Sequence, residues 1–203
     1  MISSTAGGLG GLAAERFQRL VSQRTVEPGR TAFTTTIASL ILDGPTRDLA
    51  VRVSNNNSGA QLFPGANANT FSGGLTLAHN TVTGTRMRVT QPITTVGTAG
   101  AIVSCPYGTG IIYIGEAATD RAGILFDTVL GNALYNDLVF NTALGNDRTG
   151  IRIDTTGNTL FGDITAALAP ITFSKGTGAG FTGSTSLMLT GKLTGAYGLS
   201  LND

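Results

Sequence analysis

Apolar and polar residues alternate in short segments along most of the chain. The pattern is clearest at 49–53, 86–89 and 151–153, where arginines stand beside or between the apolar positions. A period of two predicts β-strands that bury one face and expose the other. Similar apolar pairs recur at Leu75/Leu77, Ile112/Ile114, Ile124/Phe126, Leu138/Phe140, Ile171/Phe173, Leu187/Leu189 and Leu199/Leu201. Their spacing leaves no room for crossover helices, so the pattern predicts an all-β fold.

The turns between these segments indicate how the strands are connected. Tight antiparallel hairpins favour Asn-Gly or Asp-Gly, yet the chain has no Asn-Gly and one Asp-Gly, at Asp43-Gly44. Most turns instead combine Gly with Thr, Ser or Asn, as in Gly108-Thr109-Gly110. Such corners favour a parallel β-helix, in which each coil bends and stacks on the one before it. An antiparallel β-sandwich or jelly roll, or a barrel, stays open as an alternative.

Residues 1–30 have a different pattern from the rest of the chain. A glycine-rich lead is followed by apolar residues that would share one face of a helix, namely Leu12, Phe17, Leu20 and Val21. This spacing predicts a short amphipathic N-terminal helix over 12–24 that could cap the β-helix. We therefore expect two parts, a flexible lead with a capping helix over 1–30 and a β-helical repeat module over 31–203.

Composition and charge narrow the classes of function. Only 12% of the residues are charged, and 13 basic side chains nearly balance 12 acidic ones. Without a cluster of Lys or Arg, neither nucleic acid nor an anionic membrane surface is an expected partner. No segment reaches the roughly 18 apolar residues that span a bilayer. Residues 1–14 also lack the pattern of a secretory signal, so any exporting parts are expected outside this chain.

Side chains capable of catalysis are scattered. The most favourable grouping of carboxylates that stacked coils could assemble is Glu116, Asp120 and Asp137. His79 and Cys105 are the single histidine and cysteine, which excludes a His-rich metal site and an intrachain disulfide. Glycines at 8–13 match a dinucleotide fingerprint only superficially, because no apolar strand precedes them. We expect no enzyme activity, no cofactor and no metal. The aromatic residues to inspect for carbohydrate binding are Tyr107, Tyr113, Tyr135 and Tyr197.

One segment resembles a known family. Asn69-Thr70-Phe71-Ser72-Gly73-Gly74-Leu75-Thr76-Leu77 is similar to the autotransporter-associated β-strand repeat, whose typical core is Asn-Thr-(Tyr/Phe)-(Ser/Thr)-Gly-Gly-Thr-Thr. Segments resembling later parts of that repeat follow in the expected order, at 105–110, 134–139 and 171–178. Leu75 in place of Thr and Cys105 in place of Gly depart from the pattern, and no second copy of the motif follows Lys175.

The resemblance implies a fold and a setting. It implies a right-handed parallel β-helix in the secreted passenger part of a bacterial surface protein. The structural repeat motif would then consist of Asn69, Thr70, Phe71, Ser72, Gly73 and Gly74.

The function that we expect is a non-enzymatic structural or adhesive β-helical module, extracellular or on the bacterial cell surface. Because a solenoid ends in unpaired backbone groups, we expect self-association, end-to-end filaments or flanking β-helical repeats. A surface glycan or protein could be the adhesive ligand. The assembly candidates are Leu12, Phe17, Leu20, Leu199 and Leu201. The alternatives are a glycan-active lyase or hydrolase on a β-helix, and a viral or filament coat subunit with a sandwich fold.

Overall fold

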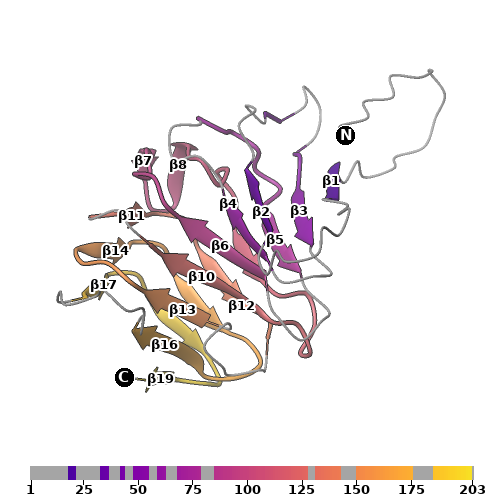
Figure 1. The fold of residues 1–203 in the computed structure, drawn as a ribbon. Coiled ribbons are helices and arrows are strands. Elements are labelled where there is room, and N and C mark those ends of the chain that lie inside the picture. The colour runs from indigo at the N-terminus through magenta and orange to yellow at the C-terminus, as the bar shows by residue number, and fades with distance from the viewer. Residues whose placement is uncertain are drawn as a thin grey trace, which may run out of the picture.

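The described part of the chain is a parallel β-solenoid. The computed structural model describes residues 18–21, 33–36, 42–43, 48–54, 59–62, 68–78, 85–127, 131–142, 150–175 and 185–202. Within these ranges the regular structure is entirely β-strand, and no helix is present. The chain passes repeatedly through the same faces, and each strand lies beside its counterpart from the next coil (Figure 1).

Two seven-stranded sheets and one three-stranded sheet form the faces of the solenoid. The first sheet contains, in spatial order, β1 (Gln18–Val21), β3 (Val51–Ser54), β5 (Leu75–Ala78), β9 (Ile112–Ile114), β12 (Leu138–Phe140), β15 (Ile164–Ala166) and β18 (Leu193–Gly195). The second contains β2 (Phe33–Thr36), β4 (Gly59–Leu62), β6 (Thr85–Val89), β10 (Ala122–Phe126), β13 (Gly150–Ile153), β16 (Ile171–Lys175) and β19 (Leu199–Asn202). The third contains β11 (Ala133–Leu134), β14 (Asn158–Leu160) and β17 (Leu187–Leu189).

The strand pairing decides between the predicted architectures. Every described pair in the three stacked sheets is parallel, as at Leu77↔Ile114 and Ile124↔Ile151. Parallel pairing between successive coils confirms the predicted β-helix. It also shows that the antiparallel sandwich or jelly roll is wrong, because consecutive strands of the three stacked sheets do not pair with each other as hairpins.

One antiparallel hairpin interrupts the regular stack. It consists of β7 (Val96–Thr98) and β8 (Ala101–Ser104), which pair only with each other among the described strands. The hairpin lengthens its coil, since the hydrogen-bonded residues Asn69 and Pro106 are 37 residues apart. In the next coil Gly110 and Asn136 are 26 residues apart. An insertion of this length conceals the coil period in the sequence.

The N-terminal segment differs from its predicted structure. Gln18–Val21, inside the helix predicted over 12–24, forms strand β1 and pairs in parallel with β3. The edge of the first sheet offers backbone partners to this segment, and such tertiary pairing overrides a helical spacing. The helix prediction is therefore wrong for these four residues, while Leu12 and Phe17 lie outside the described part of the chain.

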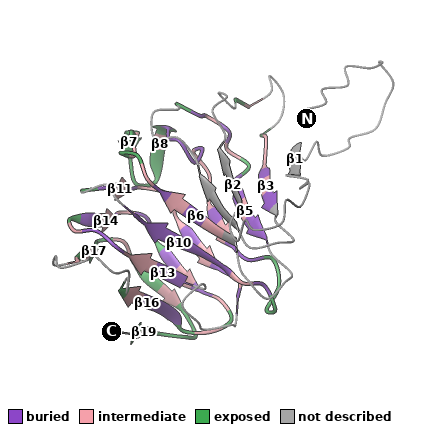
Figure 2. Cartoon of the chain, viewed as in Figure 1, coloured by how far each residue is buried: buried purple, intermediate pink, exposed green. Residues whose placement is uncertain are grey.

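The core is a set of stacked apolar columns between the sheets. In the first sheet one column runs through coil after coil in register, and its members are all buried: Val53, Leu77, Ile114, Phe140 and Ala166. The second sheet contributes Met87, Ile124, Ile151 and Phe173. Figure 2 shows buried residues along strands in the middle of the stack and exposed ones at the β7–β8 hairpin. Continuous burial of aliphatic side chains is the main stabilising contribution.

The assignment of inward and outward faces can be tested directly in β12, where buried and half-buried residues alternate. Leu138 is 1% exposed between Ile112 and Ile164, whereas the adjacent Val139 faces outward and is half-buried. We expect Leu138→Ala to lower the free energy of unfolding by about 2–5 kcal/mol, because it leaves a cavity in the core. The matched Val139→Ala should cost about 1 kcal/mol or less. Guanidinium denaturation measures both, and equal losses would contradict the assignment of faces.

Candidate functional site

The repeat motif at 69–74 forms the bend that leads into β5. The side chain of Asn69 is buried, and its Nδ2 donates a hydrogen bond to the carbonyl of Pro106 at 2.6 Å. The ring of Phe71 is also fully buried. It lies against Gly108, where an added Cβ would be only 2.4 Å from a ring carbon. The motif therefore packs directly onto the corner of the following coil.

Backbone hydrogen bonds connect the motif to both neighbouring coils. On one side the amide of Gly73 donates to the carbonyl of Leu49 at 3.1 Å. On the other side the carbonyls of Asn69 and Phe71 accept from Cys105 at 3.0 Å and Thr109 at 2.9 Å. These bonds hold three successive coils in one register, which is a structural role.

Close backbone approach favours glycine at this corner. Gly74 has a φ of +94°, and an added Cβ would be 2.8 Å from the carbonyl oxygen of Ile111. A column of residues two positions before the strands of the first sheet shows the same crowding. It consists of Gly73, Gly110, Gly162 and Gly191, where an added Cβ would lie 2.0 to 2.9 Å from backbone atoms of another coil. We call this column the glycine corner.

Asn136 occupies the same position in the coil of β12. Its buried side chain donates from Nδ2 to the carbonyls of Gly108 at 3.0 Å and Gly110 at 2.9 Å. The asparagine thus supplies side-chain hydrogen bonds to the corner of the preceding coil. Sequence analysis included this residue only as part of the segment 134–139 and did not predict its hydrogen bonds, although Asn136-Asp137-Leu138 and Gly162-Asp163-Ile164 show the same pattern 26 residues apart.

An aspartate ladder runs beside the glycine corner. Asp137 Oδ1 accepts a hydrogen bond from the amide of Asp163, and Asp163 Oδ1 accepts one from the amide of Lys192, each at 2.8 Å. Each carboxylate therefore binds the backbone of the next coil. In the last described coil the residue immediately before the strand is Lys192. A lysine side chain cannot accept a hydrogen bond, so the ladder of carboxylate acceptors stops there.

Asp43 makes a similar contact near the motif. Its carboxylate accepts from the amide of Leu49 at 2.7 Å and from the amide of Ser72 at 3.0 and 3.1 Å. Burial acts to raise the pKa of Asp43, but these hydrogen bonds outweigh it, so the pKa lies below its ordinary value of 3.8. The carboxylate stabilises the loop while it is ionised.

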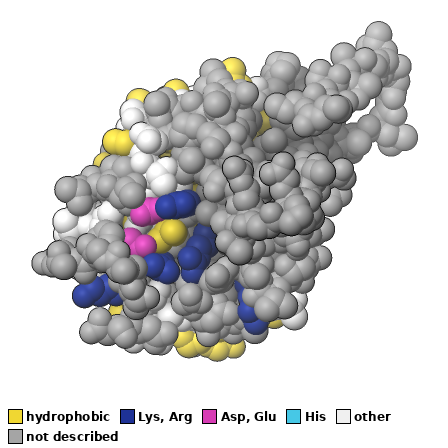
Figure 3. Space-filling model, in the orientation of Figure 1, with side chains coloured by type: hydrophobic (Ala, Val, Ile, Leu, Met, Phe, Trp, Pro, Cys, Tyr) yellow, Lys and Arg dark blue, Asp and Glu magenta, His cyan; other side chains and the backbone are white. Residues whose placement is uncertain are grey.

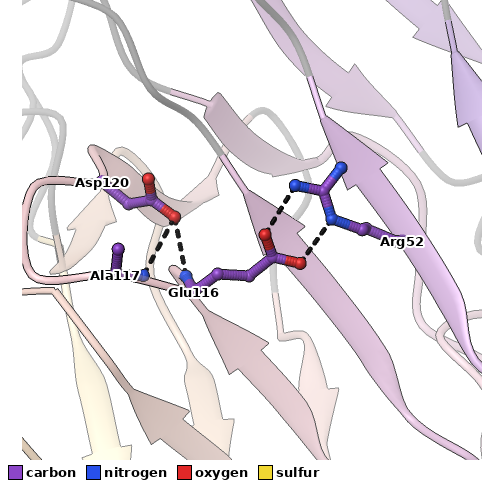
Figure 4. Close-up of polar contacts among 4 residues, drawn as sticks. All are labelled: Arg52, Glu116, Ala117 and Asp120. Atoms are coloured by element: carbon purple, nitrogen blue, oxygen red, sulfur yellow. Dashed lines mark hydrogen bonds and ion pairs between the residues drawn. The ribbon is translucent and has the colours of Figure 1, made fainter.

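The structure does not assemble the three carboxylates predicted as a possible catalytic group. Glu116 forms a bidentate ion pair with Arg52, with Nη2 and Oε2 2.5 Å apart (Figure 4). Asp120 Oδ2 accepts from the amides of Glu116 at 2.7 Å and Ala117 at 3.3 Å, which closes the loop after β9. Asp137 precedes β12, at the opposite end of the first sheet from this loop. The length of a strand therefore separates Asp137 from the other two.

Charged side chains gather on the outer face of the second sheet, over β6, β10 and β13 (Figure 3). Arg88 pairs with Asp127, and Arg152 Nε donates to Asp154 Oδ1 at 2.9 Å. The two aspartates follow paired positions of adjacent coils, since Phe126 is in register with Ile153. Each of these carboxylates is neutralised by an arginine from the same face.

Most described carboxylates therefore have structural partners. A backbone amide or an arginine bonds each of Asp43, Glu116, Asp120, Asp127, Asp137, Asp154 and Asp163. Across the described ranges, no three His, Cys, Asp or Glu side chains are grouped so as to hold a metal ion. The arrangement organises loops and coils in the part of the chain that the structure describes.

The four tyrosines lie in different environments. Tyr107 is fully buried, and burial raises its pKa above the ordinary range. Tyr113 is on the outer face of β9, Tyr135 stacks on Phe161 with ring centroids 4.5 Å apart, and Tyr197 is exposed. They do not form one aromatic platform. Cys105 is buried, which raises the pKa of its thiol, and His79 lies outside the described residues.

The C-terminal coil exposes residues that occupy core positions of the stack. Leu199 and Leu201 lie in register with Ile171 and Phe173, and Leu193 with Ile164. The three leucines are 41%, 80% and 42% exposed, whereas their partners are 2%, 6% and 2% exposed. Of the other assembly candidates, Leu20 lies in the edge strand β1.

Three comparisons with known proteins were made for this chain. Neither the known protein families nor the curated proteins nor the solved structures include a match to this chain. No helix long and apolar enough to cross a membrane occurs in the described residues.

The Asp43 contacts predict a pH-dependent contribution to stability. Because the folded-state pKa is lowered, the stabilisation is complete above the unfolded pKa of about 3.9 and is lost as the pH falls through the folded value. We expect Asp43→Asn to lower the free energy of unfolding by roughly 1–2 kcal/mol at pH 7. The difference in free energy of unfolding between the unmodified chain and Asp43→Asn should shrink toward zero near pH 2. Urea denaturation at both pH values measures it, with Asp48→Asn as the control at an exposed carboxylate. A difference that does not change with pH would contradict a role for the ionised carboxylate.

Proposed function

We propose that the chain is a non-enzymatic structural module, a β-helical segment that is extended at its C-terminal coil by further β-solenoid structure. The extension is either a second copy, which gives end-to-end filaments, or a flanking β-helical repeat. The resemblance of 69–77 to the autotransporter-associated repeat supports a location on a bacterial cell surface or outside the cell. An outer face could then bind a glycan or a protein as an adhesive surface.

The observation that carries this proposal is the exposure of core positions in the last coil. Leu201 is 80% exposed directly beside Phe173, which is 6% exposed. Burial of one leucine side chain contributes about 1.5–3 kcal/mol. Strands β17, β18 and β19 are also the last strands of their sheets in the described structure, so their outer edges offer backbone groups for pairing. A further coil would cover both the leucines and these edges.

The use of the carboxylates supports a structural role over the glycan-active alternative. The carboxylates of Asp127 and Asp154, on the second sheet, are bonded to Arg88 and Arg152. A glycosidase or lyase needs carboxylates or a base free to exchange protons with its substrate. The parallel pairing of the strands likewise disfavours the coat-subunit alternative, because that alternative requires an antiparallel sandwich fold.

Single substitutions in the end coil test the proposal. In sedimentation velocity over a wide concentration range, we expect the unmodified chain to associate as its concentration rises. Leu201→Asp should weaken this association at least about tenfold, because it places a charge on the apolar end. Leu168→Asp is the control, since Leu168 is 41% exposed but lies in the loop between β15 and β16. If the unmodified chain stays monomeric throughout, end-to-end association is wrong.

A further inference from the structure

The outer face of the second sheet brings together charges that lie far apart in the sequence. Arg86 and Arg88 are on β6 and Arg152 is on β13, while Asp127 and Asp154 directly follow β10 and β13. Figure 3 shows charged side chains gathered over these strands. The group exists only once the coils have stacked, which is why the sequence shows no run of basic residues. Three arginines against two aspartates leave an excess of one positive charge.

Two of the arginines stand in one line along the axis of the solenoid. Arg88 is in register with Leu125, and Leu125 is in register with Arg152. Since neighbouring strands are about 4.8 Å apart, the Cα atoms of the two arginines are roughly 9.6 Å apart. Leu125, the position between them, is uncharged and only 8% exposed. We call these three residues the arginine column.

The aspartates hold the guanidinium groups without using all of their donors. Arg88 bonds Asp127 through Nε and Nη2, and Arg152 Nε donates to Asp154 Oδ1 at 2.9 Å. A guanidinium has five N–H donors, so each arginine keeps donors on Nη for a ligand. The side chains of Arg88 and Arg152 are 39% and 21% exposed. Because the ion pairs already fix their positions, less side-chain entropy is lost when a ligand binds.

Resting on the proposed adhesive role of an outer face, we propose that the arginine column binds a linear acidic polysaccharide lying along the solenoid axis. Two carboxylates of the polymer pair with Arg88 and Arg152, and a neutral sugar between them lies over Leu125. One sugar unit advances such a polymer by about the spacing of one coil, so the matching polymer carries a carboxylate on every second sugar. Its hydroxyl groups can donate to the carboxylate of Asp154.

Charge density separates this partner from a nucleic acid. Duplex DNA carries one negative charge per about 1.7 Å of its axis, whereas the arginine column offers one guanidinium per about 9.6 Å. The carboxylates of Asp127 and Asp154 on the same face add repulsion toward a dense polyanion. Protein interfaces centre on an apolar core, and Leu125 exposes too little surface to supply one. A sparsely charged polymer rich in hydroxyl groups suits both the arginines and the aspartates.

Titration calorimetry with hyaluronan oligosaccharides, which carry a carboxylate on alternate sugars, tests the proposal. Neutral chitin oligosaccharides, polyglutamate and single-stranded DNA are the comparison ligands. The variants are Arg88→Gln, Arg152→Gln and the two combined, with Arg88→Lys and Arg152→Lys to keep the charge. Arg52→Gln is the matched control, because Arg52 is also paired with a carboxylate and is 30% exposed, but lies on the first sheet.

The expected affinities follow from the geometry of the column. Each Gln variant should weaken hyaluronan binding about tenfold, because it removes one charge-assisted pair. The combined variant should weaken it about a hundredfold, since the two arginines are far enough apart to act independently. Each Lys variant should weaken it about fivefold, because an ammonium group keeps the charge but loses the planar fork. Arg52→Gln should leave the affinity unchanged.

Several results would overturn the proposal. They are no hyaluronan binding by the unmodified chain, equal binding of the neutral chitin oligosaccharides, and unchanged affinity in the combined Gln variant or in both Lys variants. Tighter binding of polyglutamate or DNA would overturn the glycan as the class of partner. Leu201→Asp should bind hyaluronan as the unmodified chain does, because Leu201 lies in the last coil. Failure of C-terminal extension and failure of glycan binding are therefore separate results.

Discussion

The whole fold depends on the close approach of backbone between one coil and the next. Each coil forms its sheet hydrogen bonds with its neighbours, so a single register must hold through all three faces. The corners set that register, because there the chain changes direction while staying in contact with the coil beneath. Gly162 and Gly191 show how little space is left, with room for a hydrogen atom but not for a Cβ. The apolar columns can stack only where this approach is maintained.

Polar side chains in this protein serve mainly to preserve that register. Asn136 satisfies carbonyls of the coil below, Asp163 binds the amide of the coil above, and Arg88 pairs with a carboxylate one coil away. A buried or half-buried polar group that is bonded in this way stabilises the fold, whereas the same group left unbonded would destabilise it.

Much of the fold was predictable from the sequence because a period of two is a local property. The pairs Ile112/Ile114 and Leu138/Phe140 face inward as alternation requires, and glycine-rich corners favoured stacking over hairpins. The coil register was not predictable, because the β7–β8 insertion lengthens one coil and hides the repeat. The helical spacing around Leu20 was misleading, since pairing with β3 is a long-range contact that a local pattern does not contain. The hydrogen bonds of Asp43 to Ser72 and of Asn136 to Gly108 were missed for the same reason, because these partners lie in other coils.

The open coil makes the end of a solenoid chemically different from its middle. Inside the stack, a column residue such as Ile164 is covered from both sides, while Leu193 is covered from one. An apolar end with unpaired backbone would attract any exposed strand, and proteins commonly reduce this risk by placing lysine on the edge. Lys192 meets that requirement at the C-terminal corner, yet it leaves the leucines uncovered.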